Sequence, residues 1–221
     1  MSQRRTINAN ALGIGIATGA YGLSFGAISV ASGLDPWQTQ TLSLFMFTGA
    51  SQFALVGVLG SGGGLVAAVL TAWLLGSRNG LYALHLAPAL RLPKRLVLPA
   101  AQVTIDESTA MALRYEGSQA EARHAFWATG IAVFVLWNIG TAIGAFGAAI
   151  IDDPGVLGLD AAIPAGFMAL LWPRLKDRQT WALALAAGVL ALALTPVLPP
   201  GIPVLAAAIL PILVVAWGRW R

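Results

Sequence analysis

The sequence predicts an all-α, polytopic membrane protein with about 7–8 helical membrane segments. Of its 221 residues, 57% are hydrophobic and 10% are charged, whereas ordinary soluble domains are roughly 25% charged. The hydrophobic residues also form long blocks that short polar breaks separate. Because a charge-poor stretch of about 18 or more residues is typical of a membrane-spanning helix, these blocks predict a single transmembrane domain over residues 1–221.

Several hydrophobic stretches are the candidate segments. In chain order they are Asn8–Ala31, Trp37–Leu59, Gly63–Leu90, Ala125–Ile151, Leu157–Trp172, Gln179–Leu194 and Ile202–Trp217. The third stretch is interrupted by a short polar run, Gly76–Gly80. One kinked span there would give about seven segments and a hairpin would give about eight, and the basic loops leave the side of the N-terminus open. The main polar stretch lies between Arg91 and His124.

The composition argues against several other classes of protein. There is no cysteine, which excludes disulfides and thiolate chemistry. The two histidines, His85 and His124, have no paired ligands in the sequence, so no metal and no other cofactor is predicted. The 13 Lys and Arg residues outnumber the 9 Asp and Glu residues, but they lie in loops and form no cluster of the kind that binds nucleic acid.

Two parts of the sequence resemble each other. Residues 15–35 and 140–160 align without gaps at an offset of 125, with 8 identical residues among 21. The match indicates an internal duplication that relates residues 8–96 to residues 133–221. The alternative is that two unrelated helices both need small residues for close packing.

Each predicted half contains a hydrophobic stretch that is broken near its middle. The breaks are Gly76–Gly80 in the first half and Thr195–Gly201 in the second, and residues 97–132 link the halves. Repeats with interrupted helices at matching positions are a signature of secondary transporters, because unwound backbone at membrane depth is tolerated only where it is buried or lines a cavity. The version with seven segments would make the repeats inverted, and the version with eight would make them parallel.

The stretch Leu44–Phe53, LFMFTGASQF, combines hydroxyl groups, an amide and small residues deep in the second segment. These groups can hydrogen-bond the ammonium and carboxylate of an amino acid while phenylalanines line an apolar pocket. The alternative is close packing with hydrogen bonds between helices. The candidate substrate-binding residues in this stretch are Thr48, Gly49, Ala50, Ser51, Gln52 and Phe53.

Further candidates for substrate binding lie in other segments. Arg78 stands at the first predicted break, where it can hold a substrate carboxylate or lie at the membrane interface. Asn79 and Tyr82 follow it closely and share either role. Asn138 is an amide in the middle of a hydrophobic segment, so it is a candidate for substrate binding or for a contact between helices.

The acids are candidates for proton or ion coupling. Asp106 and Glu107 are adjacent on a short, rather apolar stretch, where half-buried carboxylates can exchange protons; the alternative is that they begin a surface helix. Asp35 and Asp160 each end a Gly-Leu-Asp triplet just before a predicted helix, and aspartate commonly caps a helix at that position. Asp160 is also a coupling candidate.

Six stretches together resemble the AzlC-like family of branched-chain amino acid exporters, in the family's order over about residues 10–175. They are GAYGLSFGAISVASGL, LFMFTGASQFALVGVL, SRNGLYALHLAP, TIDESTAMAL, WNIGTAIGAFGAAI and LGLDAAIPAGFMALL. The family often has an asparagine two residues before the arginine, where this chain has Gly76. That departure leaves the exact amino acid open.

The resemblance implies export of leucine, isoleucine, valine or similar amino acids across a bacterial or archaeal inner membrane, driven by an ion or proton gradient. It also implies a small hydrophobic membrane subunit of the AzlD type as the partner. The family's patterns fall on Gly49, Ala50, Gln52, Phe53, Arg78, Tyr82, Asp106, Glu107, Gly158, Leu159, Asp160 and Pro164.

The residues therefore favour a secondary transporter that works by alternating access, and not an enzyme. A channel would need a continuous polar lining, and the predicted helices carry few polar residues. A membrane enzyme with Asp106 and Glu107 as acid–base catalysts would need a nucleophile, a metal set or a cofactor loop beside them. A scaffold that transports nothing would favour unbroken helices. The coupling ion and the stoichiometry with a partner stay open.

Overall fold

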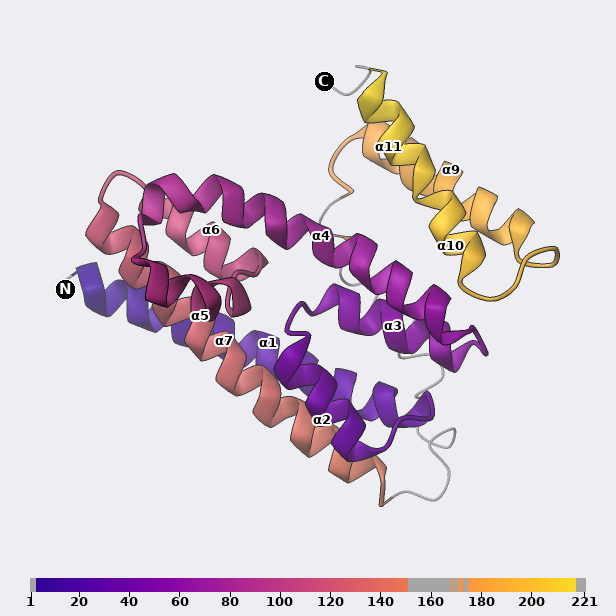
Figure 1. The fold of residues 1–221 in the computed structure, drawn as a ribbon, viewed down its shortest axis with the longest axis horizontal. Helices are drawn as coiled ribbons and strands as arrows, with labels where there is room; N and C mark the ends of the chain where they lie inside the picture. Colours follow the sequence, from indigo (N-terminus) through magenta and orange to yellow (C-terminus); the bar gives the residue numbers. More distant parts are fainter. Residues whose placement is uncertain (1–2, 151–167, 169–170, 173–174, 218–221) are drawn as a thin grey trace.

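Every regular element that the structure describes is a helix (Figure 1). The computed structural model describes residues 3–150, 168, 171–172 and 175–217. In chain order the elements are α1 (Gln3–Ala31), α2 (Pro36–Phe45), α3 (Ala50–Gly60), α4 (Leu65–Leu90), the 3₁₀ helix η1 (Lys94–Leu96), α5 (Val97–Gln102), α6 (Asp106–Arg114), α7 (Gln119–Ala148), α9 (Arg178–Leu194), α10 (Ile202–Ala207) and α11 (Ile209–Ala216). The predicted all-α class is confirmed. Asp160 and most of the predicted segment Leu157–Trp172 lie outside the described residues.

Two long helices, α1 and α7, lie side by side along their length (Figure 1). They run in the same direction: Asn8 Oδ1 and His124 Nε2 are 2.7 Å apart near the two helix starts, and Gly26 faces Thr141 towards the ends. By length and composition, these are the two helices in the described part of the chain that can cross a membrane. The larger number of spans stays a prediction.

Glycines bring the backbones of α1 and α7 into direct contact. A Cβ atom on Gly140 would lie 2.1 Å from the carbonyl oxygen of Gly19, and one on Gly144 would lie 2.0 Å from that of Leu23. These are the glycines that the aligned segments share, so close packing of small residues accounts for their spacing. The duplication itself stays a prediction. Because α1 and α7 run parallel, halves that begin with these helices would be parallel repeats and not inverted ones.

The second predicted segment, Trp37–Leu59, is not one span, and this prediction is wrong. Its first part, α2, runs along α7 in the opposite direction. Near the start of α2, the rings of Trp37 and Phe146 are 5.2 Å apart between centroids. Just beyond its end, the rings of Phe47 and Phe134 are 5.0 Å apart. The helix thus enters the fold from the far end of α7 and stops near its middle.

The chain then turns and α3 returns the way that α2 came. Gly60, the last residue of α3, lies beside Ser32 at the end of α1. The turn is possible because Gly49 takes a φ of +52°, which a side chain would strain. At the entrance to the hairpin, Asp35 accepts hydrogen bonds from the amides of Trp37 and Gln38 at 2.8 Å each. The predicted helix cap at Asp35 is therefore confirmed.

The predicted linker, residues 97–132, contains a second hairpin that enters from the opposite end of the fold. Its arms are α5 and α6. Val103, at its tip, lies beside Gly130 on α7. Further along, Met111 on α6 clusters with Ala125 near the start of α7. The second hairpin therefore also reaches from one end of α7 towards its middle.

The tips of the two hairpins touch. Gln102, the last residue of α5, donates a hydrogen bond through Nε2 to the carbonyl oxygen of Leu44 in the last turn of α2, at 2.7 Å. Between the arms, the backbone is not α-helical at residues 46–49 and 103–105. In a membrane protein, non-helical backbone within the hydrocarbon region is tolerated where it is buried or lines a cavity. The meeting point of the tips is therefore the place to look for a site.

The predicted break at Gly76–Gly80 is wrong, because α4 runs without interruption from Leu65 to Leu90. The glycine serves packing instead: a Cβ atom on Gly76 would lie 3.2 Å from Ser51 Oγ on the neighbouring α3. An uninterrupted α4 also excludes a hairpin at this segment. The other predicted break, Thr195–Gly201, is confirmed, since α9 ends at Leu194 and α10 begins at Ile202.

Candidate functional site

A cavity of about 270 Å³ lies where the two hairpin tips meet the middle parts of α1, α4 and α7. It is lined by Ala17, Thr18, Tyr21, Phe47, Thr48, Gly49, Ala50, Phe53, Arg78, Asn79, Ile105, Asp106, Glu107, Val133 and Trp137. Three of the stretches singled out in the sequence, residues 48–53, 78–79 and 106–107, thus contribute to one space although they are far apart in the chain.

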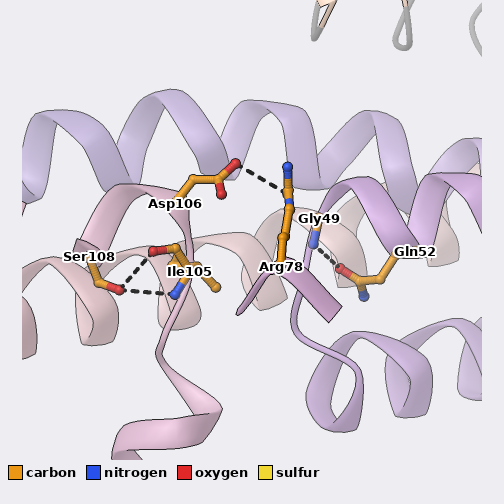
Figure 2. Close-up of polar contacts among 6 residues, drawn as sticks. All are labelled: Gly49, Gln52, Arg78, Ile105, Asp106 and Ser108. Atoms are coloured by element: carbon orange, nitrogen blue, oxygen red, sulfur yellow. Dashed lines mark hydrogen bonds and ion pairs between the residues drawn. The ribbon is translucent and has the colours of Figure 1, made fainter. Parts of the chain in front are cut away.

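An ion pair crosses the cavity wall. Arg78 on α4 and Asp106 at the start of α6 are joined by a 3.2 Å contact between Nη2 and Oδ2 (Figure 2). About 30% of each side chain is exposed (30% and 29%). In the sequence these two residues were separate candidates for different roles, and only the fold brings them together. Asp106 does begin a helix, as one alternative held, but that helix start faces the cavity.

Local hydrogen bonds fix the turn that presents Asp106. The amide of Ile105 donates to Ser108 Oγ at 3.1 Å. The Ser108 hydroxyl donates in turn to the carbonyl oxygen of Val103 at 2.6 Å, and Figure 2 shows Ser108 bridging back to Ile105. Ser108 is fully buried. It therefore sets the position of the first turn of α6, and with it the position of the carboxylate.

Several polar atoms in the cavity lining are buried and lack a hydrogen-bond partner within the described part of the chain. They are Thr48 Oγ1, Arg78 Nε, Asn79 Oδ1 and Trp137 Nε1. Leaving such a group without a partner costs about 1–3 kcal/mol, so this lining is suited to a polar ligand. The guanidinium and the indole offer N–H donors, the amide oxygen is an acceptor, and the hydroxyl can serve as either.

The remaining lining is apolar. Phe47, Phe53, Ile105 and Val133 contribute to the cavity wall and belong to the main buried cluster of the protein. The ring of Phe53 meets that of Trp137 edge to face, with centroids 6.3 Å apart. The cavity therefore combines a charged and polar part with a hydrocarbon part, which is what a small amphipathic ligand requires.

Gln52, a substrate-binding candidate in the sequence, is not among the residues that line this cavity. Its side chain is fully buried and holds the hairpin together: Oε1 accepts from the amide of Gly49 at 3.2 Å (Figure 2), and Nε2 donates to the carbonyl oxygen of Leu42 at 3.4 Å. Gln52 thus ties the start of α3 to the end of α2. It therefore positions the turn that carries Thr48, which does line the cavity.

Three other predicted site residues also lie outside this cavity. Ser51 lines a second space of about 320 Å³ beside α3 and α4. Asn138 donates to the carbonyl oxygen of Phe134 at 2.8 Å and accepts from Gln40 Nε2 at 3.1 Å, so it is a contact between α2 and α7. Tyr82 is not among the lining residues.

Two lining residues missed by the sequence analysis are aromatic. Tyr21 lies within the glycine-rich segment that the alignment emphasised. Trp137 lies inside the predicted hydrophobic segment Ala125–Ile151 and not at its end, where tryptophans of membrane helices are enriched. A tryptophan away from the membrane interface is the signal that could have identified a buried N–H group.

We expect Gln52→Ala to lower the free energy of unfolding by about 1–3 kcal/mol, because it leaves the Gly49 amide and the Leu42 carbonyl without the side-chain partner. Thermal unfolding of the purified protein in detergent measures the change, with Gln3→Ala on the exposed start of α1 as the matched control. If Gln52→Ala unfolds like the control but loses ligand binding, Gln52 is a direct ligand and the structural role is wrong.

Comparison with known proteins identifies the family. The family model for AzlC protein matches residues 13–151, more than half of the chain. The match covers both hairpins, α4, all of α7 and the part of α1 from residue 13 onwards. Searches of curated proteins and of solved structures find no match. The chain therefore belongs to the AzlC family of membrane transport proteins.

Proposed function

We propose that this chain is the large subunit of a secondary transporter that exports branched-chain or similar hydrophobic amino acids. The observation that carries the proposal is the cavity at the meeting of the two hairpin tips. It holds an arginine–aspartate pair, buried polar atoms without partners and an aromatic wall in one space. Membership of the AzlC family supports a role in transport.

The cavity has the size and chemistry for such a substrate. At about 270 Å³ it is just below the roughly 300–1,000 Å³ typical of pockets for drug-sized ligands, which suits a small solute. Arg78 can hold a carboxylate through its planar guanidinium. Phe47 and Phe53 offer the apolar surface that a branched aliphatic side chain needs. Asp106 and Glu107 remain candidates for ion coupling.

The two hairpins provide the route for alternating access in this proposal. They enter from opposite ends of the α1–α7 pair, and the described contact between their tips is the bond from Gln102 to Leu44. Withdrawing one tip would open the cavity towards one end of the fold, and withdrawing the other would open it to the opposite end. Broken elements that meet at a substrate site near the middle of the membrane are a recurrent arrangement in secondary transporters.

The proposed setting is a bacterial or archaeal inner membrane, with an AzlD-type subunit as partner. Support comes from family membership and from the apolar side chains that the short helices expose, such as Leu185, Val189 and Leu192 on α9. Exposed apolar surface of this kind is stable against lipid or against another membrane protein. The enzyme and channel alternatives gain no comparable support from the described residues.

We expect cells that express the chain together with a small membrane subunit of the AzlD type to export labelled leucine several-fold faster than cells with an empty vector. Collapsing the ion gradients should remove the difference, because secondary transport has no other energy source. Efflux of leucine, isoleucine, valine and methionine is measured with and without the small subunit. If no amino acid shows gradient-dependent efflux in either condition, the proposal is wrong.

A further inference from the structure

The pair formed by Arg78 and Asp106 is less tight than a buried ion pair should be. Their 3.2 Å contact is longer than the roughly 2.7–2.9 Å of a strong charge-assisted hydrogen bond. Arg78 Nε has no partner within the described residues, so the guanidinium does not present its full edge to this carboxylate. With about 30% of each side chain exposed at the cavity, both charges can be reached by a ligand. The pair is therefore suited to being opened.

We propose that a zwitterionic α-amino acid inserts into this ion pair, with its carboxylate on Arg78 and its ammonium on Asp106. This inference rests on the proposed function and names the chemistry that the site recognises. Each charge of the protein exchanges its partner for the opposite charge of the ligand, so no charge is left unpaired. In a partly buried site, that balance matters more than the strength of any single contact.

The neighbouring polar atoms are complementary to the two charged groups of such a ligand. Trp137 is 6% exposed, and its Nε1–H is a donor without a partner, like Arg78 Nε–H; both suit a carboxylate. Asn79 Oδ1 is an acceptor without a partner and suits an ammonium, as Asp106 does. The described lining therefore offers unpaired N–H donors for the carboxylate of the ligand and an unpaired amide oxygen for its ammonium.

The formal charges of the lining predict how single-charge ligands behave. Arg78 and Asp106 are paired with each other across the lining. A ligand with only a carboxylate takes Arg78 and leaves Asp106 without the guanidinium. A ligand with only an ammonium takes Asp106 and leaves Arg78 without the carboxylate. Both should therefore bind worse than the zwitterion.

Binding of three matched compounds to the purified full-length protein tests the proposal. Leucine carries both charges, 4-methyl-2-oxopentanoate carries only the carboxylate, and 3-methylbutylamine carries only the ammonium. We expect both analogues to bind about 100-fold more weakly than leucine, because each leaves one protein charge without its partner. Binding of either analogue within about threefold of leucine overturns the inference.

Charge-neutralising variants give a crossed pattern that a purely structural role would not produce. Asp106→Asn should lower the affinity for leucine about 100-fold but raise the affinity for the oxo acid about tenfold. The reason is that the Asp106 carboxylate no longer competes with the ligand carboxylate for Arg78. Arg78→Gln should lower the affinity for leucine and raise the affinity for the amine, because the guanidinium no longer competes with the ligand ammonium for Asp106. Arg114→Gln and Glu116→Gln, which are exposed beyond the cavity, are the matched controls and should leave all three affinities unchanged.

The outcomes separate this inference from the proposed function. If wild-type protein binds and exports leucine but the analogues or the variants fail to show the pattern, the inference alone is wrong. If the wild type neither binds nor exports leucine or its relatives, the proposed function fails and the inference fails with it. The wild-type comparison of the three compounds stands even if a variant does not fold.

Discussion

Gly144→Ala is expected to destabilise the protein by about 1–3 kcal/mol, the usual cost of forcing extra volume into a packed interface. The added Cβ would lie 2.0 Å from the carbonyl oxygen of Leu23 and 2.8 Å from its carbon. Both contacts are to backbone, so no side chain can rotate away. The α1 and α7 helices would have to move apart near the C-terminal end of α7, where their backbones touch.

The matched control lies on the same helix. Gly147 is exposed, and a Cβ atom there would meet nothing within 4 Å. Gly147→Ala should therefore be neutral or stabilise the helix by up to about 0.5–1 kcal/mol, because alanine loses less backbone entropy than glycine. Thermal unfolding in detergent and the amount of folded protein in membranes measure both variants. Equal effects would show that the two backbones do not touch as described.

Two variants of Trp137 should distinguish its role in packing from its role in ligand binding. Trp137→Ala is expected to cost about 3–5 kcal/mol of stability, as for a large aromatic side chain removed from a core. Trp137 is 6% exposed, its ring stacks on Phe25 with centroids 5.9 Å apart, and it meets Phe53 edge to face. Loss of the ring would empty the centre of the main buried cluster.

Trp137→Phe keeps an aromatic ring but removes the indole N–H. Because Nε1 is buried without a partner in the described part of the protein, removing it should spare the fold most of the cost of the alanine variant. Leucine affinity should nevertheless fall about tenfold, the loss of one hydrogen bond to a charged group. Unfolding midpoints and equilibrium binding, measured side by side, check this. Unchanged leucine binding in Trp137→Phe would exclude the indole as a substrate ligand.

The helical class and several residues of the cavity lining were predictable because they depend on local chemistry. Charge-poor blocks are unstable as anything but helices in lipid, and Asp35 caps a helix with atoms from its own next turn. Thr48, Arg78 and Asp106 carry polar groups that an apolar chain has little reason to keep unless they serve a site. Each of them could therefore be identified from the sequence as a separate candidate.

The breaks were harder to place. Gly76–Gly80 looks like an interruption, but a long helix tolerates glycine and serine when neighbours pack against them, as α3 does at Gly76. The turn within Trp37–Leu59 was hidden, because its backbone change rests on one glycine with a positive φ in an otherwise unbroken apolar run. The hydrogen bonds of Gln52 were hidden for the same reason, since they exist only around that turn.

By itself, the sequence determined the helical membrane class, the AzlC resemblance and the residues with chemistry to offer. The tertiary structure alone decided which of them share a space. Hairpins from opposite ends bring residues 48–53 and 106–107 to the middle of α4, where Arg78 meets Asp106. The physical reason is that composition and periodicity act over a few turns of helix, whereas this contact depends on how glycine-lined helices pack and where two hairpins stop.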